Sequence, residues 1–120
     1  MASILLVEDD IDLRTCLAEV LASDGHEMRL ASSGNEAIEA LKSGQQVDLI
    51  ISDHYMRDGS GVDILRYVRE RKQSRPKFFL ITGQSEMTEE NAKELGAQEF
   101  ILKPFDIPEL FSLIDKHLAN

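Results

Sequence analysis

The sequence predicts a single doubly wound (βα)5 domain of the α/β class, in which five parallel strands alternate with five helices. Two observations support this fold class. Short apolar runs of strand length recur along the chain, and after each run comes a segment whose apolar residues repeat with the helical period. The length of 120 residues and the hydrophobic content of 42% suit one core, so we expect residues 1–120 to form one domain.

The first half of the chain contains three expected strands and two expected helices. Leu13, Leu17 and Leu21 fall on one helical face, which predicts the first helix. Met28 and Leu30 alternate with polar residues, which predicts the second strand. The expected elements are strand 4–7, helix 11–22, strand 26–31, a helix that Ser43-Gly44 closes, and strand 47–52.

The second half continues the same alternation. Residues 78–81 form an unbroken apolar run, which is typical of a strand buried on both faces. Thr88 caps a short helix that Gly96 ends, and Pro108 stands at the start of the last helix. The expected elements are a helix after Gly61, strand 78–81, helix 88–95, strand 99–102, and a helix opened by Asp106 and Pro108.

Two of the apolar runs stop at acidic residues. Glu8-Asp9-Asp10 follows the first strand, and Asp53 follows the third. We expect the flavodoxin-like strand order 2-1-3-4-5, which places these strand ends side by side at one edge of the parallel sheet. Three carboxylates roughly 5 Å apart repel by about 3 kcal/mol per pair at an effective dielectric of about 20. The sequence therefore predicts a divalent cation at this edge, a phosphate chemistry that uses one, or both.

Thr82 and Lys103 follow the fourth and fifth strands, so we expect them at the same edge. A carboxylate that attacks a phosphoryl group needs cations that neutralise the phosphoryl oxygens, so acids, hydroxyl and lysine together suit phosphoryl chemistry. The set offers oxygen ligands without His or Cys, which favours Mg²⁺ over a transition metal.

The overall charge limits the partners. A formal net charge of -9 and a pI near 4.7 argue against direct binding to nucleic acid or to an anionic membrane. The single Cys16 excludes an internal disulfide, and the first apolar run is too short for a signal peptide. We therefore expect a cytoplasmic protein without a membrane span.

Four motifs stand at the ends of expected strands. They are Leu6-Val7-Glu8-Asp9-Asp10, Asp48-Leu49-Ile50-Ile51-Ser52-Asp53 with Met56 and Gly61 following, Ile81-Thr82-Gly83, and Leu102-Lys103-Pro104-Phe105. Together they resemble one known family, the CheY-like receiver domains of two-component response regulators. The resemblance extends over essentially the whole chain and implies a phosphoacceptor switch. It implies no enzyme activity beyond self-phosphorylation from phosphodonors and self-dephosphorylation.

The resemblance implies a role for each acidic residue. Asp53 matches the phosphoacceptor, which takes a phosphoryl group from a histidine kinase or a histidine phosphotransfer protein. Asp9 and Asp53 match the residues that bind Mg²⁺ together with the backbone carbonyl of Tyr55. Glu8 is implied to act mainly through a metal-bound water.

The resemblance also implies how the signal leaves the site. Thr82 matches the switch hydroxyl, Lys103 matches the lysine that pairs with the phosphoryl group, and Phe100 stands at the place of the switch aromatic. Phosphorylation is then expected to repack the surface of the fourth helix, fifth strand and fifth helix. That surface would bind an output partner, an output domain or a second copy of the chain. The Lys103-Pro104 bond resembles the family's cis peptide.

The chain departs from the family at one position. Arg57 stands four residues after Asp53, where the family usually has proline, so we expect a freer loop and an added cation near the acids. The resemblance implies that the position of Tyr55 flanks the path of the hydrolytic water, and Gln84 stands two residues after Thr82. We expect these two side chains to tune the lifetime of the phosphorylated state.

Simpler interpretations compete for several residues. Asp10 is favoured as a helix N-cap, because acids stabilise helix N-termini. Phe100 is as well explained as a core residue. His54 is not favoured as a phosphoryl relay, because neighbours on a strand point to opposite faces.

Two other function classes compete with the receiver. A haloacid dehalogenase-type phosphatase also uses an aspartyl phosphate, and Asp10-Ile11-Asp12 resembles its nucleophile motif. That class leaves Asp53 without a role. The other class is an interaction module that works without phosphorylation. Such a module would have no use for the acids, the hydroxyl and the lysine, because folding alone does not require that set. Flavin binding is weaker still, because the first loop is acidic where a phosphate-binding loop is rich in Gly, Ser or Thr.

Overall fold

The computed structural model describes residues 2–71, 75–83 and 88–118. Within these residues, strands and helices alternate as the sequence predicts. In chain order they are β1 (Ser3–Val7), α1 (Ile11–Ser23), β2 (Glu27–Ala31), α2 (Gly34–Lys42), β3 (Leu49–Asp53), α3 (Gly61–Glu70), β4 (Lys77–Thr82), α4 (Glu89–Glu94), β5 (Glu99–Leu102) and α5 (Ile107–Leu118).

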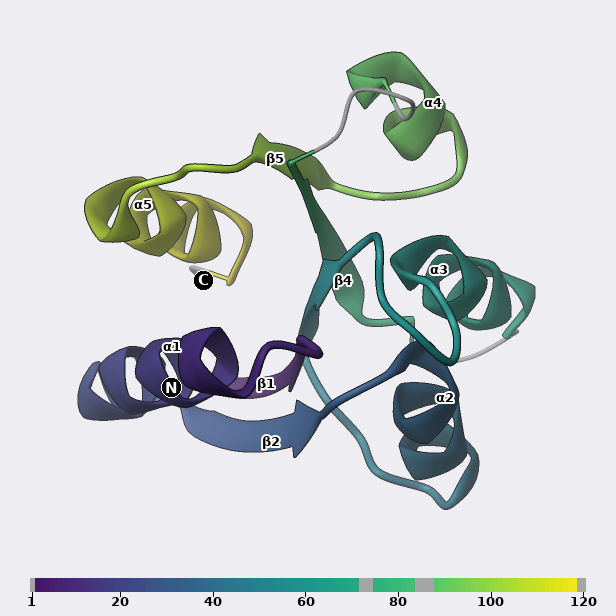
Figure 1. The fold of residues 1–120 in the computed structure, drawn as a ribbon, viewed down its shortest axis with the longest axis horizontal. Helices are drawn as coiled ribbons and strands as arrows, with labels where there is room; N and C mark the ends of the chain where they lie inside the picture. Colours follow the sequence, from purple (N-terminus) through teal and green to yellow (C-terminus); the bar gives the residue numbers. More distant parts are fainter. Residues whose placement is uncertain (1, 72–74, 84–87, 119–120) are drawn as a thin grey trace.

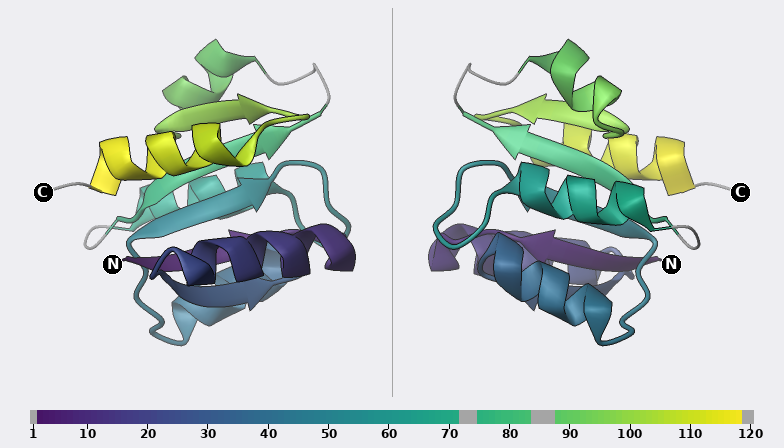
Figure 2. Two further views of the ribbon diagram at one scale, coloured as in Figure 1. Left: turned by 90° about the vertical axis from the view of Figure 1, so that its left-hand side faces the viewer. Right: turned by 90° about the vertical axis from the view of Figure 1, so that its right-hand side faces the viewer.

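The five strands form one parallel sheet in the order β2-β1-β3-β4-β5, which confirms the predicted fold class and strand order. All of the strand arrows in Figure 2 run in one direction. The carboxyl ends of β1 and β3 are adjacent, because Val7 of β1 pairs with Ser52 of β3. Asp53 pairs with Ile81 of β4, one residue before Thr82. The register therefore brings three predicted site segments to one edge.

Helices cover both faces of the sheet (Figure 1), with α1 and α5 on one face and α2, α3 and α4 on the other. Side chains alternate between the two faces along each strand, so Phe78 joins the core beneath α3 while Phe79 joins the core beneath α1 and α5. Both rings are almost completely buried, and each burial stabilises the fold by about 2–3 kcal/mol.

The central strands are more deeply buried than the edge strands. All of β3 is buried, as expected for a strand covered on both faces. The second strand departs from the predicted alternation, because Met28 packs against the core while Leu30 is 47% exposed. Since β2 lies at the sheet edge, the helices cover it only in part.

Polar side chains begin the helices as predicted. Asp10 caps α1 by accepting hydrogen bonds from the N–H groups of Asp12 and Leu13, which confirms the cap prediction. Thr88 caps α4. The Lys103-Pro104 peptide bond is cis, as predicted. In the described part of the chain, no helix has both the length and the apolar character needed to cross a membrane.

Candidate functional site

Three carboxylates converge at the carboxyl edge of the sheet. Glu8 and Asp9 follow β1 directly, and Asp53 is the last residue of β3. One oxygen from each carboxylate lies within 4.8 Å of the others. Glu8 is 4% exposed and Asp53 is 8% exposed, so two of the three acids are buried. The predicted convergence of these acids is confirmed.

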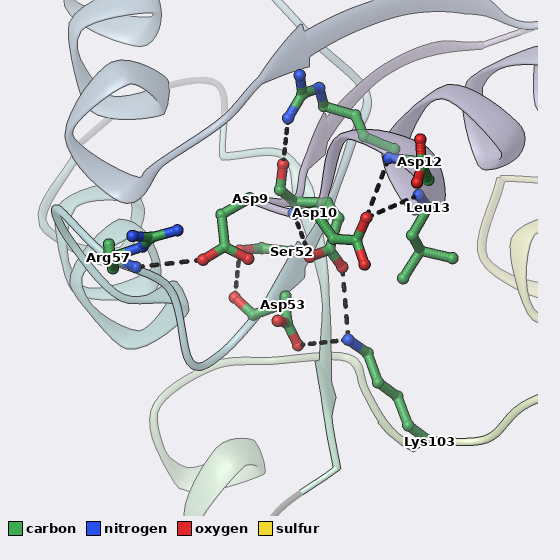
Figure 3. Close-up of polar contacts among 10 residues, drawn as sticks. Asp9, Asp10, Asp12, Leu13, Ser52, Asp53, Arg57 and Lys103 are labelled. Carbon is green, nitrogen blue, oxygen red and sulfur yellow. Dashed lines mark hydrogen bonds and ion pairs between the residues drawn. The ribbon is translucent and has the colours of Figure 1, made fainter.

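Lys103 joins the acids from β5 (Figure 3). Its Nζ lies 3.3 Å from Asp53 Oδ1 and 3.5 Å from Glu8 Oε1. Its backbone N–H donates to the carbonyl oxygen of Thr82 at 2.9 Å, which fixes the start of the lysine against the end of β4. Thr82 itself is fully buried. One ammonium group is therefore shared by two carboxylates.

The pKa values reflect this shortage of positive charge. Burial raises the pKa of Glu8, although the Asp10 N–H donates to its carboxylate at 3.1 Å. Burial likewise raises the pKa of Asp53, and the attraction of Lys103 offsets only part of that rise. For Lys103, burial acts to lower the pKa, but the attraction of Asp53 and Glu8 raises it. The ammonium is thus firmly charged, whereas the acids lack full compensation.

The donor set fits a hard divalent cation. Glu8, Asp9 and Asp53 offer carboxylate oxygens within a few ångströms of one another, and Mg²⁺ binds oxygen ligands. Such a cation would relieve the repulsion and the burial cost that raise the pKa of two of these acids. The acidic cluster is therefore one that can hold a metal. Tyr55 lies two residues after Asp53 with its side chain 42% exposed, and the role of its carbonyl stays a prediction.

Close backbone contacts hold the loop that follows Asp53. The His54 N–H donates to the carbonyl of Ile81 at 2.8 Å, and the Gly61 N–H donates to the carbonyl of His54 at 3.0 Å. A Cβ on Gly61 would lie 2.5 Å from the Asp53 carbonyl oxygen, so only glycine fits there. Asp53 is therefore followed by a tightly packed turn.

Arg57 makes a contact that the sequence did not predict. Its backbone N–H donates to Asp9 Oδ2 at 3.4 Å (Figure 3). A proline has no N–H and could not make this bond. The departure at this position therefore adds a hydrogen bond to one of the acids, in addition to the exposed guanidinium.

The other predicted residues lie around the site or away from it. Phe100 is partly buried against the core beneath α2, α3 and α4. The ring centroids of His54 and Tyr55 lie 4.4 Å apart. Gln84 lies outside the described residues. The sequence predicted no contact for Asp58, whose carboxylate accepts hydrogen bonds at the start of α2, and no motif or periodic pattern marks this residue.

The fold and the site together define a class of protein. A parallel sheet of order 2-1-3-4-5, with acids after β1, an aspartate at the end of β3 and a lysine after β5, is the architecture of a CheY-like signalling domain. The chain belongs to the response regulator receiver domain family, whose model matches residues 4–115. It is thus the receiver domain of a two-component response regulator.

Solved structures share the whole fold. The response regulator protein TrrA from Thermotoga maritima, in complex with Mg(2+)-BeF, is 32% identical with a TM-score of 0.85, and the match covers 98% of this chain and 100% of that one. The chemotaxis protein CheY4 of Vibrio cholerae is 30% identical with a TM-score of 0.86, over 98% and 99% of the two chains.

Relatives with longer chains match as well. The DNA-binding transcriptional regulator NtrC of Azospirillum brasilense is 36% identical over 99% of this chain and 24% of its own length. The transcriptional regulatory protein CpxR of Escherichia coli is 34% identical over 95% of this chain and 48% of its own length. The chain thus spans about a quarter to a half of these relatives.

Proposed function

We propose that Asp53 accepts a phosphoryl group from the phosphohistidine of a histidine kinase or a histidine phosphotransfer protein. The observation that supports this most directly is the position of the Asp53 carboxylate. It stands at the sheet edge among two other acids, with Oδ1 3.3 Å from the Lys103 ammonium. We further propose that residues 1–120 act as one receiver unit in the cytoplasm.

The reaction requires a nucleophile and positive charge. A carboxylate oxygen of Asp53 forms a bond to phosphorus, while the bond from phosphorus to the histidine nitrogen breaks and its electron pair leaves with the imidazole. Lys103 lies where it can pair with the phosphoryl oxygens.

Glu8, Asp9 and Asp53, with the Tyr55 carbonyl, would hold Mg²⁺, which when bound neutralises charge on the transferring group. The complex of TrrA with Mg(2+)-BeF supports this cofactor for the family.

The proposed switch starts at Thr82. Thr82 is buried at the end of β4, and its backbone carbonyl accepts a hydrogen bond from the Lys103 N–H. The two residues that we propose to follow the phosphoryl group are therefore joined by one backbone hydrogen bond. Their movement, with rotation of Phe100, would shift the population toward a state in which the α4-β5-α5 surface is repacked. That surface would bind an output partner, an output domain or a second phosphorylated copy. The transcriptional regulators among the relatives favour an output domain.

The competing phosphatase has less support. Its nucleophile would be Asp10, but that carboxylate is engaged as the N-cap of α1. An interaction module without phosphorylation leaves the acids and Lys103 without a purpose, because their burial is not needed for folding.

Acetyl phosphate with Mg²⁺ tests the proposal. We expect intact-mass spectrometry to show a gain of one phosphoryl group, which disappears in Asp53→Asn and persists in Asp10→Asn. The matched Asp10 variant removes an acid from the same edge without removing the acceptor. A gain that survives Asp53→Asn, or hydrolysis of a generic phosphate ester that requires Asp10, would contradict the proposal.

The lifetime of the phosphorylated state tests a second part of the proposed function, the role of Tyr55. We propose that the exposed ring of Tyr55 shields the aspartyl phosphate from water. Tyr55→Ala should then lose the phosphoryl group faster than the wild type, as followed by the decay of the added mass. Equal decay rates would remove Tyr55 from the mechanism.

A further inference from the structure

Asp58 adopts a backbone conformation that is uncommon for a residue with a side chain. Its φ is 62°, in the left-handed region, and among the described residues it is the only non-glycine with positive φ. Aspartate adopts this region more readily than most residues with a side chain, but the conformation remains uncommon, so the contacts of Asp58 are of interest. Asp58 belongs to the loop between Asp53 and α3, so the contacts that hold it also act on the site.

The contacts of Asp58 lead to the first residues of α2. Its carboxylate accepts a hydrogen bond from Asn35 Nδ2 at 2.8 Å and another from Ser33 Oγ at 3.3 Å. Its carbonyl accepts from the Asn35 N–H at 3.0 Å. The neighbouring Gly59 carbonyl accepts from the Gly34 N–H, also at 3.0 Å. Two side-chain and two backbone hydrogen bonds thus clamp the loop to the helix.

The two backbones are also in steric contact. A Cβ on Gly34 would lie 2.5 Å from the Gly59 carbonyl carbon, and one on Gly59 would lie 2.7 Å from the Asn35 nitrogen. The loop therefore has little freedom to move toward α2. The hydrogen bonds of Asp58 prevent the opposite movement, away from α2.

The clamp lies next to the acidic cluster. Arg57, which precedes Asp58, donates its N–H to Asp9 Oδ2 at 3.4 Å. A hollow of about 500 Å³ is lined by Asp9 together with Ser33, Asn35, Arg57 and Asp58. The Arg57 amide that contacts Asp9 is therefore one residue away from the clamp.

We propose that Asp58 is a positioning residue for the phosphorylation site, because its clamp to α2 holds the loop of residues 54–60 against Asp9 and Asp53. This inference rests on the proposed function, and it assigns Asp58 no contact with the phosphoryl group. An aspartate in a turn more often bonds to its own turn. Here both carboxylate bonds instead reach residues more than 20 positions earlier in the chain.

A set of variants distinguishes loss of the clamp from a general loss of stability. Asp58→Asn retains an acceptor for Asn35, and asparagine tolerates positive φ, so it should behave like the wild type. Asp58→Ala loses both carboxylate bonds. Asn35→Ala removes one partner, and the double variant should be no worse than Asp58→Ala, because both changes break the same contact. Asp48→Ala is the matched control, since Asp48 accepts from the Ser3 N–H at the other end of the sheet.

Two measurements test the proposal. In metal-free protein, Asp58→Ala should raise hydrogen exchange at the Gly34, Asn35 and Arg57 amides about tenfold. Titration with Mg²⁺ alone, followed by amide chemical shifts, should show affinity weakened about three- to tenfold, and the acetyl phosphate rate at low Mg²⁺ should fall by a similar factor. Asp58→Asn should restore all three values to within about twofold.

The outcomes distinguish the two proposals. The clamp is overturned if Asp58→Ala matches the wild type, if Asp58→Asn is as impaired as Asp58→Ala, or if Asp48→Ala weakens Mg²⁺ binding equally. If the wild type takes up no phosphoryl group while the exchange and Mg²⁺ effects appear as expected, the proposed function fails and the clamp stands.

Discussion

Each end of β5 carries a cluster of acids and bases, and the two clusters are balanced in opposite ways. At the carboxyl end, Lys103 is shared by the buried acids Glu8 and Asp53. At the amino end, a single acid, Glu99, contacts His117 Nε2 at 2.7 Å and Lys116 Nζ at 3.4 Å. The first cluster has more acids than bases, and the second has more bases than acids.

The pKa directions follow from that difference. Burial raises the pKa of Glu8 and of Asp53, because one lysine cannot compensate both. Burial also acts to raise the pKa of Glu99, but the hydrogen bond from His117 and the charge of Lys116 outweigh it, so the pKa of Glu99 is lowered. The same residue types therefore stabilise the fold at one end of β5 and leave unsatisfied charge at the other, where a ligand can use it.

Lys103→Met is expected to change the free energy of unfolding more than any other substitution considered at the two ends of β5. It leaves Glu8 and Asp53 without their shared cation, so the free energy of unfolding at neutral pH should fall by about 2 kcal/mol, less than for a fully buried pair because the Lys103 side chain is 31% exposed. Urea unfolding at about pH 7 and about pH 4 measures it, and the loss should shrink in acid, where the carboxylates protonate. A loss that grows in acid would contradict the charge argument.

Asp53→Asn should raise the free energy of unfolding, whereas Lys103→Met lowers it. Because the pKa of Asp53 is raised in the folded state, its ionised form costs stability above that raised pKa, and the cost disappears as the pH falls below the value in the unfolded chain. The variant should gain on the order of 1 kcal/mol in unfolding free energy near neutral pH. The gain should vanish near pH 3, and Mg²⁺ should stabilise the wild type more than the variant. A variant less stable than the wild type at neutral pH would overturn this account.

Glu99→Gln tests the acid at the other end. The pKa of Glu99 is lowered in the folded state, so its ionised carboxylate stabilises the fold above the pKa of the unfolded chain. This stabilisation is lost as the pH falls through the pKa of the folded state. The variant should lose about 0.5–1 kcal/mol at neutral pH and nothing below about pH 3. Comparison of unfolding free energies across this range gives the answer, and a pH-independent loss would indicate packing rather than charge.

Lys116→Met should have the smallest effect and is the matched control for Lys103→Met. The Lys116 side chain is 68% exposed, so its pairing with Glu99 should contribute at most about 0.5 kcal/mol, decreasing with added salt. Urea unfolding at low and high salt measures it. An effect as large as that of Lys103→Met would show that exposure does not distinguish the two ends of β5.

Much of the fold was predictable because it depends on local patterns. Unbroken apolar runs such as Phe78 to Ile81 identified the buried strands, and Asp10 and Thr88 marked helix starts by their capping side chains. The exposed Leu30 was not predictable from alternation, because exposure depends on where β2 lies in the sheet.

The residues of the site were predictable from the sequence, but most of the contacts between them and the neighbouring loop were not. Each predicted acid and Lys103 follow or end a strand, and parallel strands bring such residues together whatever the loops do. The Asp58 clamp and the Arg57 hydrogen bond were missed, because they join segments far apart in sequence through loop conformations that have no periodic pattern.

The sequence by itself determined the alternation of strands and helices and the residue types at each strand end, because hydrophobic period and capping act over a few neighbouring residues. Only the tertiary structure decided how charges are shared. It gave Lys103 two acids and Glu99 two bases, since pKa values depend on burial and on distances between residues that the chain separates widely. It also placed Asp58 on α2, where packing of two backbones sets the loop beside the acids.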